Sequence, residues 1–212
     1  IQSALKSLGN GVLCHEMFHS LGAPDLYHYN EAYLNYSSVG AWDLMEQTAN
    51  PPQSMLAYMK YRYGKWISEV PEITKGGTYF IRPISNETSQ CYKISTPKNS
   101  NQYFMLEYRK KVTPFESSLP GTGVIIYRIN KSADGYGNVY YPDIPDEVYI
   151  YRPKGTTTVS GDIDNAYFSN YVGRTVFGNA TDPACFLSDG KLGDIYIYDI
   201  QVTDTGAFFS VN

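Results

Sequence analysis

The chain has 212 residues, a formal net charge of −4 and 42% hydrophobic residues, and this composition argues against disorder. The weak acidity offers no basic stripe for a phosphate backbone, so no nucleic-acid partner is predicted. No apolar run reaches the ~18–20 residues of a membrane span, and the first residues lack the charged-then-apolar pattern of a signal peptide. Because the chain opens at Ile1 rather than Met, we expect a processed or trimmed product.

The first third of the chain is expected to be helical. Over residues 3–21, apolar side chains recur near the 3.6-residue period of a helix. Gly22 and Pro24 predict the end of this helix, since one favours a helix C-terminus and the other cannot continue it. A loop rich in Tyr, Asn and Ser follows over residues 25–38.

A second helix is predicted after the tight segment 40–45. Pro51 or Pro52 would begin it, because proline is favoured in the first helical turn, and it would end near Tyr63. These elements make up the first predicted part of the chain, residues 1–68.

The remaining part, residues 69–212, is expected to be rich in β-structure. Short runs of β-branched and aromatic residues alternate there with Gly, Pro, Asn and Ser turns, and 21 tyrosines in the whole chain favour strands. Seven strands are predicted, over residues 78–82, 90–96, 102–108, 123–129, 148–152, 194–200 and 207–211. The predicted class is α+β, with an antiparallel, sandwich-like β-region that packs on residues 1–68.

The strongest chemical signal is His15-Glu16-Met17-Phe18-His19. Residues i and i+4 share one face of a helix, so both imidazoles can bind one metal ion. Glu16 lies close enough to accept a proton from an attacking water, and a catalytic zinc site needs these neutral nitrogen ligands and a nearby carboxylate base. The alternative is a surface helix with two unconnected histidines.

The residues after His19 extend this pattern. The spacing His-Glu-x-x-His-x-x-Gly-x-x-Asp, which ends at Asp25, resembles the extended metzincin motif, in which the glycine lets the chain turn and bring a third ligand under the metal. An aspartate oxygen is an acceptable zinc ligand. Met45, in the segment Trp42-Asp43-Leu44-Met45, resembles the structural methionine of the metzincin Met-turn.

Together these segments resemble the immune inhibitor A family of secreted bacterial zinc metallopeptidases. The likeness is tightest over residues 15–45 and looser after residue 130. It is carried by the His15–Tyr27 motif, Gly40-Ala41-Trp42-Asp43-Leu44-Met45, Gly64-Lys65-Trp66-Ile67, Tyr103-Phe104-Met105-Leu106-Glu107-Tyr108-Arg109 and Leu119-Pro120-Gly121-Thr122-Gly123-Val124-Ile125-Ile126.

The resemblance implies a zincin-type active-site helix followed by a Met-turn, with one catalytic Zn²⁺ on His15, His19 and Asp25 and Glu16 as general base. It implies a secreted or cell-surface bacterial protein that hydrolyses a protein or peptide substrate. It also implies an N-terminal region of the parent chain that completes the cleft. The apolar face formed by Leu5, Leu8, Val12 and Met17 would then be exposed, and the isolated chain would be a weak protease.

Several alternatives stay open. His28, Glu31 or Glu46 could replace Asp25 as third ligand. Ca²⁺ is a further candidate cofactor, because side-chain oxygens are its preferred ligands; the candidate residues are Asp134, Asn138, Asp143, Asp162 and Asp164.

The function predicted from the sequence is that of a zinc-dependent endopeptidase. The alternative from another class is a catalytically incomplete or metal-free binding or adhesion module derived from such a peptidase. A zinc hydrolase of non-protein amides or esters would use the same chemistry. Among the three cysteines, Cys14 is expected to be a small buried residue of the first helix.

Overall fold

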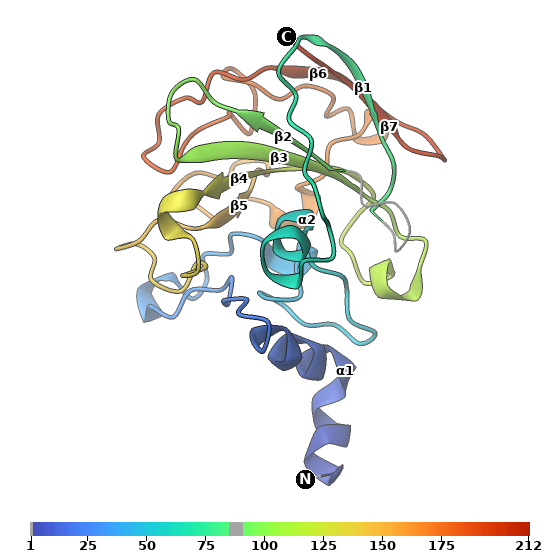
Figure 1. Ribbon diagram of the computed structural model, residues 1–212, viewed down its shortest axis with the longest axis vertical. Helices are drawn as coiled ribbons and strands as arrows, with labels where there is room; N and C mark the ends of the chain where they lie inside the picture. Colours follow the sequence, from blue (N-terminus) through green and yellow to red (C-terminus); the bar gives the residue numbers. More distant parts are fainter. Residues whose placement is uncertain (1, 85–90) are drawn as a thin grey trace.

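Three layers make up the fold of the computed structural model, which describes residues 2–84 and 91–212, with side chains from residue 9 onward (Figure 1). The first layer holds α1 (Gln2–His19) and α2 (Ala57–Met59), which continues as a π-helical turn over Lys60–Gly64. Within α1, Gly9 has a φ of 76° and separates two helical stretches. The predicted first helix is therefore present but kinked.

The two antiparallel sheets form the other layers. The central sheet has the strand order β2-β3-β4-β5, and the outer sheet has the order β1-β7-β6. Their bounds are β1 (Gly77–Ile81), β2 (Cys91–Ser95), β3 (Gln102–Arg109), β4 (Gly123–Asn130), β5 (Val148–Ile150), β6 (Ile197–Val202) and β7 (Ala207–Val211). All seven predicted strands are confirmed within a few residues, although the expected first residue of β2, Gln90, lies outside the described part.

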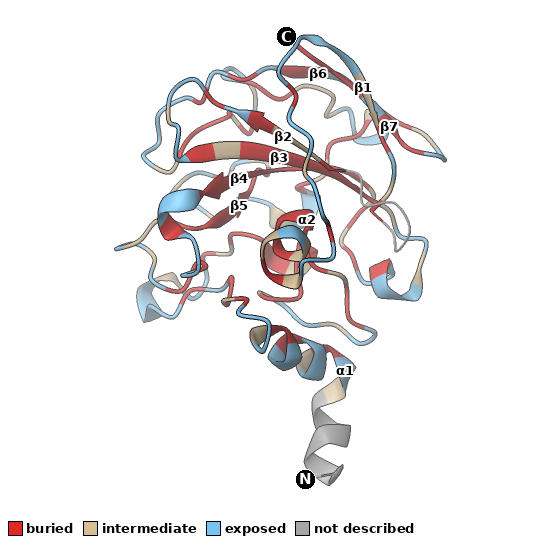
Figure 2. Cartoon of the chain, in the orientation of Figure 1, coloured by how far each residue is buried: buried red, intermediate tan, exposed pale blue. Residues whose placement is uncertain are grey.

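The central sheet is buried on both faces, as the red along β4, β5 and most of β3 shows (Figure 2). One face, with Met105 and Tyr127, packs against side chains of the helical layer such as Trp42. The opposite face, with Phe104, packs against residues of the outer sheet such as Phe209. Because both faces are covered, β4 is buried along its whole length and has no polar–apolar alternation.

The predicted start of the second helix, at Pro51 or Pro52, is wrong. The chain from Pro51 to Leu56 is not helical, and the helix begins only at Ala57. Buried carboxylates give the physical reason, because Asp43 accepts the N–H of Leu56 at 2.7 Å and Glu107 accepts that of Ala57 at 2.6 Å. These acceptors satisfy the first N–H groups of the helix from outside and so fix where it begins.

The outcome is a mixed α+β protein with two antiparallel sheets. None of the helices in the described residues has the length and apolar character to cross a membrane.

Candidate metal centre

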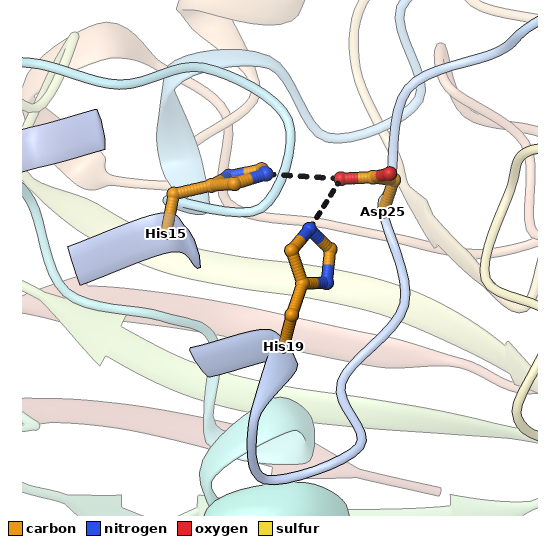
Figure 3. A group of neighbouring side chains, drawn as sticks. All are labelled: His15, His19 and Asp25. Carbon is orange, nitrogen blue, oxygen red and sulfur yellow. Dashed lines mark ion pairs between the residues drawn. The ribbon is translucent and has the colours of Figure 1, made fainter. Parts of the chain in front are cut away.

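His15 and His19 lie on the last turns of α1 and point toward a common neighbour, Asp25 (Figure 3). The helix ends directly after His19, where the backbone N–H of Gly22 bonds the carbonyl of His19 at 2.8 Å. Gly22 has a φ of 87°, a conformation that glycine adopts without strain. The chain therefore turns back along the helix and brings Asp25 opposite the two imidazoles.

Three ligand atoms converge in this group. Oδ1 of Asp25 lies 3.0 Å from Nε2 of His15 and 3.2 Å from Nε2 of His19. His15 and Asp25 are buried, at 7% and 6% exposure, and the His19 side chain is 33% exposed. Within the described residues this is the one group of three or more His, Cys, Asp or Glu side chains with metal-binding spacing.

The hydrogen bond of Nδ1 in each imidazole determines whether Nε2 carries a hydrogen or a lone pair. Nδ1 of His15 lies 3.0 Å from the carbonyl oxygen of Leu44, and Nδ1 of His19 lies 2.8 Å from that of Ala23. A carbonyl oxygen only accepts, so each Nδ1 carries the ring hydrogen. In the neutral imidazoles both Nε2 atoms therefore present lone pairs to Asp25, and this is the orientation that backbone carbonyls impose on metal-binding histidines.

The residues present fit a zinc ion. Oδ1 of Asp25 is buried and accepts no hydrogen bond of regular geometry from any described residue, so with both imidazoles neutral a negatively charged atom faces two lone pairs. Tetrahedral zinc bonds of ~2.0–2.2 Å place ligand atoms roughly 3.3 Å apart, close to the separations of 3.0 and 3.2 Å. A divalent cation would satisfy all three atoms at once.

The charges of the group are strongly coupled. The adjacent Asp25 carboxylate raises the pKa of His15, against the lowering effect of burial. Burial alone raises the pKa of Asp25, but contacts with His15 and Tyr29 and the charge of His19 outweigh it, so the net pKa is lowered. In the absence of a metal ion, these shifts favour an ion pair between the carboxylate and a protonated histidine.

Two tyrosines border the group. The phenol of Tyr29 donates a hydrogen bond to Oδ2 of Asp25. The ring of Tyr27 stacks on His15 at a centroid distance of 6.4 Å and lies 5.4 Å from the ring of Tyr29. The motif reasoning missed Tyr29, and its position four residues after Asp25 carries no signal in a zinc-binding motif.

Glu16, the predicted general base, is exposed beside His15 on α1. Its negative charge is close enough to help raise the pKa of His15, whose main cause is the Asp25 contact. Burial raises the pKa of Tyr27, and the charges of Asp25 and Glu16 act in the same direction. The carboxylate of Glu16 is thus solvent-accessible at the edge of the group.

The segment with Met45 forms a turn against the group. Met45 is fully buried, and its carbonyl accepts the N–H of Leu26 at 2.9 Å, in the loop that carries Asp25. The preceding carbonyl, of Leu44, is the acceptor for His15. The carboxylate of Asp43 closes the turn by accepting the N–H of Met45 at 2.7 Å.

A buried arginine connects this turn to the central sheet. Arg109 donates to the carbonyl of Trp42 at 2.9 Å, and forms ion pairs with Glu107 at 3.2 Å and with Glu116 at 2.8 Å. The paired positions Glu107 and Arg109 on β3 therefore have a structural role, because their charges satisfy one another and the backbone of the turn.

The alternative third ligands lie elsewhere. His28 is buried, and its Nε2 lies 2.8 Å from Oδ1 of Asp146, whose other oxygen accepts the hydroxyl of Ser38. Glu46 accepts bonds from the Ser37 hydroxyl and the N–H of Val39, and Glu31 is exposed in the 3-10 helix Glu31–Tyr33. None of the three alternatives belongs to the converging group.

Three of the five candidate calcium ligands, Asp134, Asn138 and Asp162, are engaged with protein groups. Asp134 forms an ion pair with Arg62 at 2.7 Å. The side chain of Asn138 donates to the carbonyls of Leu26 and Val148. Asp162 accepts the N–H and the side-chain amide of Asn165 at 3.4 and 3.0 Å. The structure does not bring these side chains together as a metal-binding group.

An apolar cavity of about 600 Å³ lies against a different side of α1 from the histidines. Its lining includes Cys14 and Met17 of α1, Leu21 just after the helix, and Trp66 and Phe115. Cys14 is exposed there, which corrects the expectation of a buried side chain. His15, His19 and Asp25 are not among its lining residues.

No protein-family model, curated protein or solved structure matches this chain.

Proposed function

We propose that the chain is a zinc-dependent endopeptidase whose metal ion is held by His15, His19 and Asp25. The observation that carries the proposal is the convergence of two Nε2 lone pairs on a buried carboxylate oxygen that accepts no regular hydrogen bond from the described residues. Two backbone carbonyls fix this arrangement by accepting from Nδ1 of each histidine. Such a donor set is typical of a catalytic zinc site with three protein ligands.

Glu16 is the general base of the proposed reaction. A bound zinc ion supplies Lewis-acid chemistry that polarises a scissile carbonyl and acidifies the attacking water. Glu16 accepts the proton of that water and passes it to the leaving amine, a role open to an exposed carboxylate beside His15. Met45 takes no part in the proposed chemistry. It is buried in the turn whose Leu44 carbonyl bonds His15.

The likeness to the immune inhibitor A family supports a peptide substrate and a secreted protein as parts of this proposal. It rests on the motifs around His15 and Met45. The resemblance also implies a further layer over α1. Of the four residues of its apolar face, Met17 is 62% exposed and Val12 is half-buried, while the side chains of Leu5 and Leu8 lie outside the described part.

Hydrolysis assays test the proposal. The protein is loaded with one equivalent of zinc and incubated with casein, with short peptides and with small non-peptide amides and esters. We expect cleavage of peptide bonds that a chelator abolishes and added zinc restores. Zinc-dependent hydrolysis of the small amides or esters alone would contradict the endopeptidase assignment, and a protein that binds no zinc would contradict the metal centre.

A further inference from the structure

The two oxygens of Asp25 have different neighbours. Oδ1 faces the Nε2 atoms of His15 and His19, whereas Oδ2 accepts the phenol hydrogen of Tyr29. We propose that Tyr29 is a positioning residue of the metal centre, which holds Asp25 so that it binds the ion through one oxygen only. This inference rests on the proposed zinc site and adds to it a residue outside the ligand set.

The chemistry of a carboxylate explains why such a partner matters. A free carboxylate can rotate and bind a cation through one or both oxygens. When one oxygen accepts a hydrogen bond from the protein, only the other oxygen is left to bind the cation. Partners of this kind orient metal ligands, and their loss typically weakens metal affinity by ~10–100-fold. A tyrosine phenol carries its hydrogen at neutral pH, so Tyr29 can donate to Asp25.

The surroundings of Tyr29 hold its phenol in place. Its backbone N–H bonds the carbonyl of Val139 at 3.2 Å. Its ring lies 5.4 Å from that of Tyr27, and Tyr27 in turn stacks on His15. The two rings thus connect Asp25 to the first histidine through side chains as well as through the prospective ion.

The position also favours a clean substitution. Tyr29 is 56% exposed, so its ring contributes little to the core, and Tyr29→Phe removes the hydroxyl alone. Tyr140 provides a matched control, because it is a surface tyrosine of similar exposure, 54%, whose ring contact is with Tyr136. Tyr140→Phe removes the same hydroxyl from a tyrosine that does not hydrogen-bond to Asp25.

The test measures zinc affinity by competition with a chromophoric chelator, for the natural protein, Tyr29→Phe and Tyr140→Phe. We expect the affinity of Tyr29→Phe to fall by ~10–100-fold and that of Tyr140→Phe to stay unchanged. Far-UV circular dichroism verifies that all three proteins are folded.

A second readout reports on the ligand atoms themselves. In Co²⁺-loaded protein the visible d–d bands weaken as the coordination number rises. We expect weaker bands for Tyr29→Phe than for the other two proteins, because Asp25 is free to bind through both oxygens. Equal zinc affinity and equal cobalt spectra for Tyr29→Phe and the natural protein would overturn the role of Tyr29 and leave the zinc site standing. A natural protein that binds neither metal would overturn both.

Discussion

Single atoms decide whether the group of His15, His19 and Asp25 holds a metal ion or only an ion pair. Both imidazoles use Nδ1 for a backbone carbonyl, so the occupant of the space between the Nε2 atoms and Oδ1 is either a proton on one ring or a cation. Protons and zinc therefore compete for the same lone pairs.

This competition predicts a pH dependence of zinc binding. The Asp25 contact raises the pKa of His15 above its ordinary value of 6.5, so protons compete at a higher pH than for a free histidine. Zinc affinity should fall as the pH is lowered from 8 to 5, with the decline already under way above pH 6.5. Chelator competition over this range measures it, and an affinity that does not change with pH would contradict the ligand assignment.

The third ligand is tested by a pair of substitutions. Asp25→Ala removes the only carboxylate in the converging group of the described residues and should weaken zinc binding. His28→Ala removes a histidine that pairs with Asp146, so it should lower stability but leave zinc stoichiometry at one. The reverse pattern in metal analysis would transfer the ligand role to His28.

The general base is tested by Glu16→Gln. The amide keeps the shape of the side chain but cannot accept a proton, so zinc should stay bound while zinc-dependent hydrolysis falls by ~10²-fold or more. Glu16 is exposed, so stability should not change. Turnover close to that of the natural protein would remove Glu16 from the mechanism.

Among the elements, the turn from Asp43 to Met45 connects α1 with the start of α2. The Asp43 carboxylate accepts the N–H of Met45 and that of Leu56, while the carbonyl of Leu44 holds His15. The helix itself lies close to this region, because a Cβ at Gly11 would stand 2.1 Å from the carbonyl oxygen of Ala49. The position of the histidines thus depends on a glycine that nothing larger can replace without a shift.

Asp43 gives a pH-dependent prediction at this scale. Burial raises its pKa to about 7, against the lowering effect of its backbone hydrogen bonds. The folded protein therefore binds this proton more tightly than the unfolded chain, and the contribution to stability is full below the ordinary pKa of 3.8 and is lost as the pH rises through 7.

The measurement compares the natural protein with Asp43→Asn by denaturant unfolding at several pH values. An amide oxygen can accept one of the two N–H groups but its NH₂ faces the other, so Asp43→Asn should cost about 1–3 kcal/mol. The free-energy difference between the two proteins should grow as the pH falls from 8 to 5. A difference that shrinks over this range would contradict the raised pKa.

For the whole molecule, local patterns predicted more than long-range arrangement. The seven strands lie where runs of β-branched and aromatic residues predicted them, because that signal is contained in each segment. The pairing of β1 with β7, which puts Tyr79 opposite Phe209, depends on packing between distant parts of the chain and has no local signature. The same limit explains the late start of α2, which distant acceptors on Asp43 and Glu107 decide.

In the candidate site, too, the local features could be predicted from the sequence and the long-range ones could not. The spacing of His15, His19 and Asp25 is a local property, and the structure brings these three together. The carbonyl of Leu44 could not be predicted, since every residue has one and only the folded turn selects it. Tyr29 was missed for a related reason, because a single phenol near a motif gains a role only through its geometry.

The most direct test of the metal centre is X-ray diffraction from crystals of zinc-loaded protein at the zinc absorption edge. We expect one anomalous peak, bonded to Nε2 of His15, Nε2 of His19 and Oδ1 of Asp25 at ~2.0–2.2 Å. No peak at these three atoms, or one on His28 or Glu46 instead, would contradict the proposed metal centre.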